Sequence, residues 1–514
     1  IHRDTLPLAW FGVYESSSEY TMQEDENVNN DTLISDFHLL NDEKEYVRSI
    51  QQILKYISEG DTYQINFTNK YLFENRDSLS ALYHQLRKKQ HVSYSAYLHT
   101  DTHAILSFSP ELFFHRNGNT IITKPMKGTA PRGRTLHEDN TIAEWLRNDE
   151  KNRSENLMIV DLLRNDLGRI CNIGSVHVPS MFDVEKYDSL FQMTSTVSGT
   201  LREKISYYDI FRALFPCGSV TGAPKIRSME IIHELEQTSR GVYCGAIGFF
   251  SPHDEAMFNV AIRTLTLHNE KGTFGIGSGI VADSIPEKEF EECTLKANFL
   301  TQPLVEFQLI ETLLWKNGFT FFDEHLARLR NSAEYFGFLY DDEKIRLTFK
   351  QYEREYLSSQ QKSKIRVRFL LFRTGAISLS HRILNAAPRK LIIKLALEQT
   401  HSGNRFLFHK TTHRALYDAY SIRAEEENIV DYIFTNEKNE ITEGSYTNIF
   451  IKKNDVLLTP PCECGLLPGV YRNNILATYS SSQEQILTIE EMRSADAIYL
   501  CNSVRGWMKV TFEK

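Results

Sequence analysis

Cysteine is scarce in this chain, and the few cysteines form no recognisable disulfide or metal pattern. Seven occur among 514 residues, at positions 171, 217, 244, 293, 462, 464 and 501. Their number is odd, and the pair Cys462 and Cys464 has no second pair that would complete a zinc site. Structural disulfides belong mainly to oxidising compartments. We therefore expect reduced thiols in a cytoplasmic protein.

Long apolar runs, signal-peptide features and an excess of basic charge are also absent. No run of residues is long and apolar enough to span a bilayer. The formal net charge is −9 and there is no polybasic arm, so neither nucleic acid nor a membrane is an expected partner. Apolar residues make up 41% and charged residues 24%, a balance typical of globular proteins with several domains at this length. The chain begins with Ile1 rather than Met, so we expect part of the N-terminus to be missing.

A basic loop is the most informative stretch that is present. Residues 121–134 read I-I-T-K-P-M-K-G-T-A-P-R-G-R. Their glycines and prolines predict a tightly specified loop after a short strand. Lys127, Thr129 and Arg132 make this loop suitable for an anionic small molecule. Taken alone, such a charged run is more often a solvated surface turn.

One predicted strand carries a face of amides and hydroxyls. Residues 62–68 alternate, so that Gln64, Asn66 and Thr68 share one face. Such a face either meets water or lines a polar pocket. From the strand alone, we favour contact with water.

A second predicted strand, residues 105–114, is interrupted by Pro110, which cannot donate a ladder hydrogen bond. Glu111 follows Pro110 and has apolar neighbours, which would raise its pKa and suit a general acid. A glutamate on an edge strand facing solvent is an equally good interpretation.

Two segments predict anion-binding backbone. Residues 216–225 form a Gly/Pro loop that opens a predicted helix at 225–237, and free N–H groups at a helix start bind anions. Residues 274–279 predict a second, glycine-rich turn with similar N–H groups. This turn does not have the G-x-G-x-x-G pattern of dinucleotide sites.

An acidic helix face follows. Ser284 and Glu287 predict a capping box at a helix start, after which Glu289, Glu292 and Lys296 share one face. Two carboxylates there could hold a divalent ion if a third acid, such as Glu155 of the predicted helix 152–170, approached. A solvated acidic face is the more common alternative.

The pattern resets near residues 301–306 without a flexible linker. Residues 307–330 predict a strand, a turn at Asn317 and Gly318, a second strand and a helix. Further on, Lys410 ends an apolar run, where its pKa could fall as an imine-forming lysine requires. The helix expected after Gly469 offers a second phosphate seat at its N-terminus.

The first 300 residues carry a series of motifs that resembles the chorismate-utilising enzymes, in particular the family of aminodeoxychorismate synthase component I. The motifs are K-P-M-K-G-T-A-P-R-G at 124–133, E-N-L-M-I-V-D-L-L-R-N-D-L-G-R at 155–169, G-S-V-T-G-A-P-K at 218–225, R-G-V-Y-C-G-A-I-G at 240–248, F-N-V-A-I-R-T at 258–264 and G-S-G-I-V-A-D-S at 277–284. The resemblance implies a layered α+β fold with its site between core strands and helices. Relatives have a further N-terminal stretch before the region that matches residues 7–12, so part of this domain is expected to be missing.

The resemblance also implies roles for residues of this chain. Lys127 would attack C2 of chorismate, and Glu111 would assist loss of the C4 hydroxyl. The metal ligands would be Glu155 and Glu292, directly, and Glu289, through water, with Mg²⁺ as the ion. The substrate-binding residues would be Gln64, Thr129, Thr221, Tyr243, Arg263, Gly277, Ser278, Gly279 and Lys296.

Two positions separate the branches of that family. Enzymes that add water carry a lysine where this chain has Gln64, so water is not the expected nucleophile. Anthranilate synthases carry alanine where this chain has Lys127. Lysine at that position is the mark of aminodeoxychorismate synthase, in which ammonia enters at C4 and displaces the lysine.

Residues 307–514 resemble the class IV pyridoxal-phosphate enzymes, which include branched-chain and D-amino-acid aminotransferases and aminodeoxychorismate lyase. The motifs are E-H-L-A-R-L-R-N-S-A at 324–333, H-K-T-T-H-R-A-L-Y-D at 409–418, T-E-G-S-Y-T-N-I-F at 442–450, L-L-P-G at 466–469 and C-N-S-V-R-G at 501–506. The resemblance implies a two-lobed α/β domain, Lys410 as the Schiff-base lysine and Glu443 as the acid at the pyridine nitrogen. The cofactor-binding residues would be Arg328, Lys410, Glu443, Thr447, Val470, Asn502 and Ser503.

Together, the two halves indicate an α+β enzyme with a chorismate-binding domain at 1–303 and a pyridoxal-phosphate domain at 304–514. The first would aminate chorismate, and the second would expel pyruvate to leave 4-aminobenzoate, a folate precursor. Ammonia would come from a separate glutamine amidotransferase subunit, and a homodimer could form through the second domain. One alternative is an anthranilate synthase-like half joined to a branched-chain or D-amino-acid transaminase. The other is a non-enzymatic scaffold that binds a glutaminase.

Overall fold

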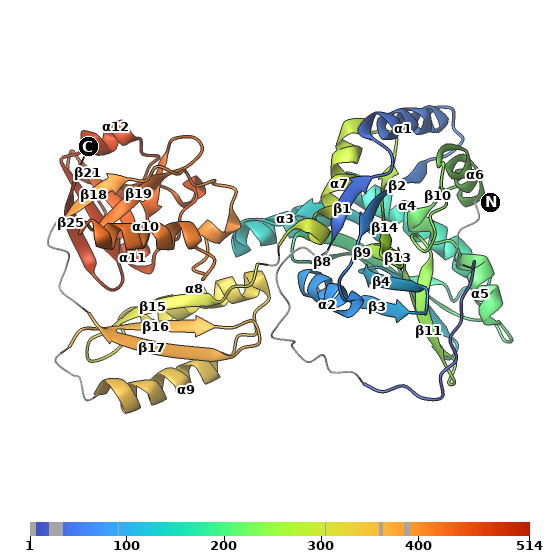
Figure 1. Cartoon of the computed structure of the whole chain (residues 1–514), viewed down its shortest axis with the longest axis horizontal. Helices are drawn as coiled ribbons and strands as arrows, with labels where there is room; N and C mark the ends of the chain where they lie inside the picture. Colours follow the sequence, from blue (N-terminus) through green and yellow to red (C-terminus); the bar gives the residue numbers. More distant parts are fainter. Residues whose placement is uncertain are drawn as a thin grey trace. The chain divides into compact units, whose positions relative to one another are not determined.

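The computed structural model describes residues 7–19, 34–90, 92–303, 305–358, 363–384 and 391–513. Two compact units make up the chain (Figure 1). The first contains residues 1–131 and 143–304, and the second contains residues 132–142 and 305–514. The chain is 33% helical and 34% strand, which confirms the predicted α+β class. None of the described helices is both long and apolar enough to cross a membrane.

The first sheet of the first unit is built around the predicted polar strand. Helices α1 (Glu43–Ser58), α2 (Leu79–Lys89), α6 (Lys225–Leu235) and α7 (Pro286–Thr301) pack on its apolar face, and α1 and α7 lie side by side in Figure 1. Within the described residues, its strands follow the order β1 (Ser35–Leu39), β2 (Gln64–Glu74), β14 (Lys271–Ile280), β13 (Thr264–His268), β4 (His103–Ser109) and β3 (Tyr94–His99), with the short β10 (Gly222–Ala223) also on β2.

The polar face of β2 does not meet water, contrary to the expectation from the strand alone. Gln64, Asn66 and Thr68 are all buried. Both long edges of β2 are paired, since β14 runs along one and β1 and β10 lie along the other. A strand enclosed in this way can keep polar side chains only where they serve a buried site or one another.

The glycine-rich stretch 274–279 is a strand rather than the predicted turn. It forms the second half of β14 and pairs with β2 throughout. The reason for its glycines is close approach of other side chains: a Cβ at Gly275 would lie 2.2 Å from the Tyr243 ring, and a Cβ at Gly279 would lie 2.4 Å from Lys127 Nζ.

The second sheet begins where the chain crosses out of the first. Strand β4 ends at Ser109, and β5 starts at Leu112 in the other sheet, so the predicted break at Pro110 is confirmed and marks the crossing. Helices α4 (Glu150–Gly168) and α5 (Tyr207–Leu214) pack on this sheet. In the described part of the chain, its order is β11 (Ala246–Ser251), β12 (Glu255–Val260), β5 (Leu112–Asn117), β6 (Thr120–Lys124), β9 (Leu190–Thr200) and β7 (Met126–Pro131), with β8 (His177–Lys186) on β9.

Helix α7 starts differently from the prediction. Its N-cap is Ile285 and its first residue is Pro286, whose fixed φ and missing N–H suit a first helical position. Ser284 does not cap the helix. Its hydroxyl donates to Glu289 Oε1 at 2.7 Å and accepts from the Val281 amide at 3.1 Å, so the predicted capping box is wrong.

The second unit has two lobes, as the resemblance implies. The smaller lobe is an antiparallel sheet of β15 (Leu309–Trp315), β16 (Ile365–Leu371) and β17 (Ile377–Ile383) that packs on α8 (Phe322–Phe336) and α9 (Asp342–Tyr352). The turn at Asn317 and Gly318 forms with positive φ at both residues. The second strand predicted after it does not form, because Phe319 makes only an isolated bridge to Trp315 before α8 begins.

The larger lobe is a mixed sheet with helices α10 (Ala415–Glu426), α11 (Val470–Thr478) and α12 (Ile489–Arg493). Parallel pairing of β18 with both β19 and β25 sets its centre. In the described ranges, its strand order is β20 (Ile441–Gly444), β19 (Asp431–Thr435), β18 (Ile392–Leu395), β25 (Gly506–Phe512), β24 (Ala497–Asn502), β21 (Asn448–Lys453), β22 (Val456–Thr459) and β23 (Ser482–Glu484).

Residues 132–142, which include the start of α3 (Leu136–Asn148), belong to the second unit although they follow β7 directly in sequence. Arg132 and Asp139 form a buried ion pair, with Nε to Oδ2 at 2.9 Å. Arg132 also donates to the carbonyl of Tyr335 at 2.8 Å, and the Tyr335 hydroxyl donates to the carbonyl of Gly133 at 2.6 Å. The segment is therefore an integral part of the core of this unit.

We expect Asp139→Ala to lower the free energy of local opening around α8 by roughly 3 kcal/mol, because it leaves Arg132 buried without its partner. Hydrogen exchange of peptides from α8, followed by mass spectrometry, measures this change. Asp323→Ala is the control. Asp323 also lies on α8, and its ion pair with Arg346 of α9 is exposed, so its removal should leave the exchange nearly unchanged. Equal exchange in the two variants would show that the segment is peripheral.

Candidate functional site

In the first unit, Lys127 lies at the centre of several predicted residues. It is carried by β7, and its Nζ lies 3.5 Å from Glu155 Oε2 of α4. Its side chain passes over Gly279, where any larger residue would collide with the ammonium group. The Asn156 amide donates to the Lys127 carbonyl at 3.2 Å and fixes the backbone. Most of the predicted loop is therefore the half-buried strand β7, with specified contacts, and not a solvated turn.

Glu111 lies at the crossing between the two sheets and is only 3% exposed, so the solvent-facing interpretation is wrong. Burial raises the pKa of Glu111 to about 7, against the hydrogen bonds of Ser219 and of the Met126 backbone and the charge of Lys127, all of which lower it. One of its carboxylate oxygens, Oε1, is buried without a hydrogen-bond partner among the described residues. A carboxyl that is half protonated at neutral pH can act as a general acid.

Gln64 is fully buried, yet neither its Oε1 nor its Nε2 has a hydrogen-bond partner in the described part of the chain. Its Nε2 lies beside the same position of Gly279 that Lys127 approaches. A buried amide with both ends unsatisfied is costly unless something else binds there. Gln64 is therefore well suited to contact a polar ligand next to Lys127.

The side chains of three other predicted substrate-binding residues form hydrogen bonds to other residues of the protein. Thr129 donates to Gln192 at 3.1 Å, and Thr221 donates to the Cys217 carbonyl at 2.9 Å. The Ser278 hydroxyl lies 3.4 Å from the Tyr46 hydroxyl. These side chains brace the surrounding strands.

Tyr243 stacks against the glycine positions of β14, with its hydroxyl 3.3 Å from the place a Cβ would take at Gly277. Arg263 has a positive φ and donates to Gln90 Oε1 at 2.5 Å. Its guanidinium makes no hydrogen bond or ion pair to the residues around Lys127 within the described ranges. Burial lowers the pKa of Arg263, and the nearby Tyr187 opposes this effect.

The predicted metal ligands do not form a protein cage. Glu292 pairs with Lys296 at 2.8 Å, and Glu289 is held by Ser284. Burial opposes ionisation of Glu292, but the charges of Lys296 and Lys127 outweigh it and lower its pKa. Across the described residues, no three His, Cys, Asp or Glu side chains come together in a way that could hold a metal ion. Glu155 nevertheless lies 3.5 Å from Lys127 Nζ, and the charge of Lys127 also acts on Glu292.

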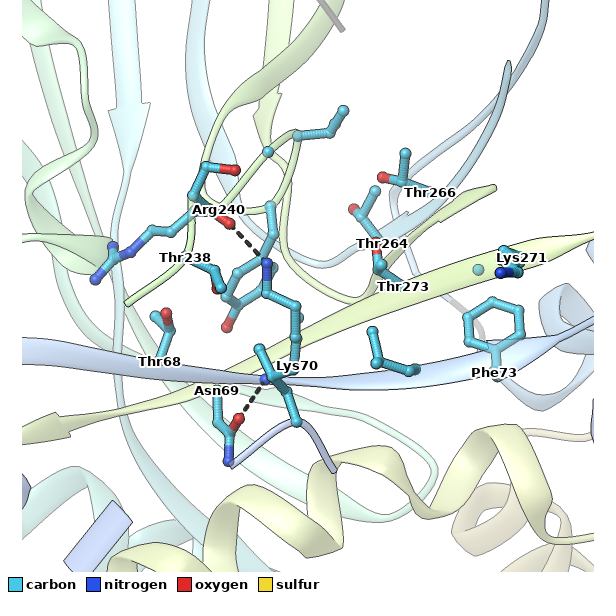
Figure 2. A pocket seen from close by; sticks show the side chains of 18 of the residues that line it. Thr68, Asn69, Lys70, Phe73, Thr238, Arg240, Thr264, Thr266, Lys271 and Thr273 are labelled. Atoms are coloured by element: carbon cyan, nitrogen blue, oxygen red, sulfur yellow. Dashed lines mark hydrogen bonds between the residues drawn. The ribbon is translucent and has the colours of Figure 1, made fainter. Parts of the chain in front are cut away.

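A separate cavity of about 470 Å³ lies on the threonine-rich face of the first sheet (Figure 2). Lys70 crosses it and donates to the Ser239 carbonyl at 2.7 Å, while its backbone amide donates to Asn69 at 2.8 Å. Tyr243 is shared with the predicted site, but Lys127, Glu111 and Gln64 do not line this cavity. We therefore do not assign it to the chemistry of Lys127.

In the second unit, one cavity of about 640 Å³ is lined by all of the predicted cofactor-binding residues. Lys410 lies in it, and its carbonyl accepts a hydrogen bond from Ile310 at 2.9 Å. Burial is the main reason that the pKa of Lys410 falls to about 7, and the charges of Arg414 and Arg328 lower it further. An amine that is about half neutral near pH 7 is a competent nucleophile for a carbonyl.

Glu443 is held by two side chains of the same cavity. The Tyr417 hydroxyl donates to Oε1 at 3.1 Å, and Asn448 donates to Oε2 at 3.2 Å. Burial raises the pKa of Glu443 to about 8, despite hydrogen bonds from Leu467 and Tyr417 that lower it. A buried acid of this kind is suited to a basic ring nitrogen.

Arg328 is oriented by an acid that sequence reasoning missed. Glu311 of β15 accepts from Arg328 Nε at 2.9 Å and from its NH2 group at 2.7 Å, and it also contacts His325 Nδ1 at 2.7 Å. Burial opposes ionisation of Glu311, but Arg328 and His325 hold its pKa at about 2. The sequence did contain a signal for Glu311: it is an acid within the apolar strand L-I-E-T-L-L-W. A charged acid is too costly to bury without a partner.

Helix α11 presents an open N-terminus to this cavity. Its N-cap is Gly469, which makes no side-chain cap, and a Cβ there would lie 1.9 Å from Asn448 Oδ1. Thr447 and Asn502 also line the cavity, but both are bound within the protein: Thr447 donates to Asp431 of β19 at 2.7 Å, and Asn502 Oδ1 accepts from the amides of residues 504 and 505. Free backbone N–H groups near Val470, together with Arg328, form a cationic seat for a phosphate.

His409, which precedes Lys410, is held by the segment 132–142 of the same unit. Its Nε2 lies 3.1 Å from the Arg134 carbonyl, and its Nδ1 lies 2.9 Å from the Ser332 hydroxyl. The imidazole stacks on Tyr335 with ring centroids 4.4 Å apart. Because a carbonyl can only accept, Nε2 carries the proton and Nδ1 accepts from Ser332.

Comparison with known proteins identifies a separate family for each half of the chain. The profile of the chorismate binding enzyme family matches residues 12–302, and that of the class IV amino-transferases matches residues 308–511. The chain is 44% identical over 269 residues to aminodeoxychorismate synthase, chloroplastic, of Arabidopsis thaliana (51% of this chain, 29% of that protein). It is 40% identical over 288 residues to aminodeoxychorismate synthase component 1 of Escherichia coli strain K12 (56% and 62%).

Anthranilate synthase component 1 3 of Haloarcula marismortui is also similar, at 39% identity over 264 residues (51% of this chain, 52% of that protein). The chain spans less than two thirds of the length of each of these three curated relatives. The family resemblances drawn from the motifs are confirmed. The chain therefore belongs to the chorismate binding enzyme family and carries a class IV amino-transferase domain after the chorismate-binding part.

Proposed function

We propose that the chain makes 4-aminobenzoate in two steps, at two separate sites. The first site aminates chorismate to 4-amino-4-deoxychorismate, and the second removes pyruvate from that product. The observation that carries the proposal is a pair of half-buried lysines, each with a buried glutamate of raised pKa on which the lysine charge acts: Lys127 with Glu111, and Lys410 with Glu443. Two such pairs serve two covalent reactions.

At the first site, the Lys127 amine forms a bond to C2 of chorismate while the C4–O bond breaks. Glu111 donates its proton to the departing hydroxyl, which leaves as water. Ammonia then forms a bond to C4, and the lysine leaves C2. Gln64 offers an amide to the polar substrate beside the attacking nitrogen. The covalent lysine adduct divides a difficult allylic substitution into two easier ones.

Magnesium fits this site as an ion that the protein and the substrate would coordinate together, and not as an ion enclosed by protein ligands alone. Mg²⁺ in enzymes is commonly held by one or two carboxylates together with an anionic substrate. Glu155 and Glu292 come from different helices; Glu155 lies beside Lys127, and the charge of Lys127 also acts on Glu292, which suits such sharing. The ion would neutralise the carboxylates of chorismate.

The chemical groups that line the second site fit pyridoxal phosphate. Lys410 would hold its aldehyde carbon, Glu443 its pyridine nitrogen, and Arg328 with the N-terminus of α11 its phosphate. When bound, the group supplies an electron sink for carbanion chemistry. Lys410 removes the proton from C4 of the substrate, which allows pyruvate to leave and the ring to become aromatic.

The rival assignment joins an anthranilate synthase-like half to an amino-acid transaminase. Lys127 opposes the first part, because the family resemblance puts alanine at that position in anthranilate synthases. Formation of glutamate from 2-oxoglutarate with a branched-chain or D-amino acid would establish the second part.

The partner and compartment are also proposals. We propose that ammonia is delivered by a separate glutamine amidotransferase subunit, that the second unit mediates a homodimer, and that the protein works in the cytoplasm. The seven cysteines support the last point, since all are free thiols.

The nitrogen source can be tested directly with the purified chain. These 514 residues contain no G-x-C-x-G nucleophile loop of a glutaminase. We expect chorismate to be consumed with ammonium, and with glutamine only after a glutaminase subunit is added. Product analysis by mass spectrometry measures this. Glutamine-dependent turnover by the chain alone would contradict the proposal.

The two lysines should have separable roles. Lys127→Ala should abolish amination of chorismate, because the covalent route is lost, while Lys410→Ala should accumulate 4-amino-4-deoxychorismate. Each loss should be roughly a thousandfold or more. Chromatography of the products measures both steps, and a mixture of the two variants should again form 4-aminobenzoate. Lys124→Ala is the control, since Lys124 of β6 forms an ion pair with Glu185 of β8. Normal 4-aminobenzoate formation by Lys410→Ala would refute the second step.

The pH dependence of the first step should report Glu111. A general acid works in its protonated form, and this form declines as pH rises through about 7. At fixed free ammonia, we expect the rate ratio of the native chain to Glu111→Gln to fall about tenfold for each pH unit above that value. Initial rates of chorismate consumption between pH 6 and 9 provide the test. A constant ratio would assign the proton to another group.

A further inference from the structure

Three arginines of the smaller lobe line the Lys410 cavity. Arg366 and Arg368 belong to β16, and Arg382 belongs to the neighbouring strand β17. The residues that alternate with these arginines on β16, Ile365 and Val367, turn to the other face of the sheet and are fully buried in the core of the lobe. The alternation of β16 therefore directs only its cationic side chains toward the cavity.

Three arginines so close together destabilise the protein when no anion is bound. Arg366 lies directly opposite Arg382 in the register of the two strands, and like charges in that position destabilise a sheet. None of the three forms an ion pair with an acid in the part of the chain that the structure describes. By contrast, Arg328 pairs with Glu311, and Arg414 pairs with Asp418.

The local potential is positive. Burial lowers the pKa of Arg366, and the charges of Arg382, Arg368 and Arg505 lower it further, against a single opposing carboxylate, Glu425. Arg505 lines the same cavity from the turn between β24 and β25. A wall of this kind becomes stable when anions neutralise it.

We infer that Arg366, Arg368 and Arg382 bind the carboxylates of a dianionic amino substrate in the Lys410 cavity and select it over amino acids with apolar side chains. The inference rests on the proposed function, in which the substrate carries one carboxylate on its ring and one on its enolpyruvyl group. The planar guanidinium matches a carboxylate through two parallel hydrogen bonds. A branched-chain amino acid has a single carboxylate and would place its apolar side chain against this charged wall.

The phosphate of the cofactor does not account for these arginines. Its predicted seat is formed by Arg328 and the N-terminus of α11, which the three arginines do not join: they lie on β16 and β17 of the smaller lobe. The cavity of about 640 Å³ has room for a second molecule beside the cofactor.

The test uses the full chain loaded with pyridoxal phosphate and two unreactive probes, isophthalate and benzoate. Binding of each probe is followed through the visible absorbance of the bound cofactor. We expect isophthalate to bind roughly tenfold more tightly than benzoate, because it offers a second carboxylate. Arg366→Gln and Arg382→Gln should each remove most of this preference without releasing the cofactor. Arg330→Gln, on the outer face of α8 and paired with Asp342, is the matched control and should retain it.

The same variants have a kinetic signature. Loss of a carboxylate contact made equally in substrate and transition state raises KM for 4-amino-4-deoxychorismate and leaves kcat nearly unchanged. Arg382→Lys keeps the charge and should recover part of the affinity. An intact isophthalate preference in both glutamine variants would overturn the inference. A chain that prefers isophthalate through these arginines but releases no 4-aminobenzoate would retain the inference and refute the proposed lyase step.

Discussion

Removal of water from ionisable side chains is the constraint on which both sites depend. Burial is the largest influence on the pKa of Glu111, Lys410 and Glu443, and it acts in each case against the charged form. Nearby charges and hydrogen bonds only partly compensate. As a result, two acids and one amine titrate close to neutral pH instead of near their usual values. The fold opposes charge at these positions, and the proposed reactions use the resulting reactivity.

The backbone around Lys127 explains how such burial is achieved. Glu111 sits where the chain leaves one sheet for the other, a place with protein on both sides. The Lys127 side chain extends from β7 over β14 only because β14 has no side chain at Gly279. The glycines of β14 weaken that strand in isolation. Its continuous pairing with β2 compensates and keeps the open path that the lysine needs.

Several features of the fold and of the candidate sites could be predicted from the sequence. The features that were missed depend mostly on contacts between distant segments. The helix predicted at 152–170 corresponds to α4, and Pro110 located the strand break, because these signals are local. The buried face of Gln64 and the strand at 274–279 depend on pairing between segments some two hundred residues apart, which no local pattern reports. Glu311 was overlooked although its partners on α8 are only 14 and 17 residues away, and the acid within an apolar strand was the signal for a buried ion pair. The arginines of β16 and β17 alternate like any exposed strand, and only the cavity reveals their position.

The segment 132–142 shows that the second unit is not a continuous stretch of sequence. The class IV profile begins at residue 308, yet the Tyr335 hydroxyl and His409 Nε2 have their acceptors on Gly133 and Arg134. Without that segment, two buried donors would lose their hydrogen bonds, at a cost of roughly 1–3 kcal/mol each. His409 is covalently joined to Lys410, so the position of Lys410 depends on residues that follow β7 directly. Lys127 and Lys410 therefore belong to separate units, but the segment that follows the strand of Lys127 binds the residue next to Lys410.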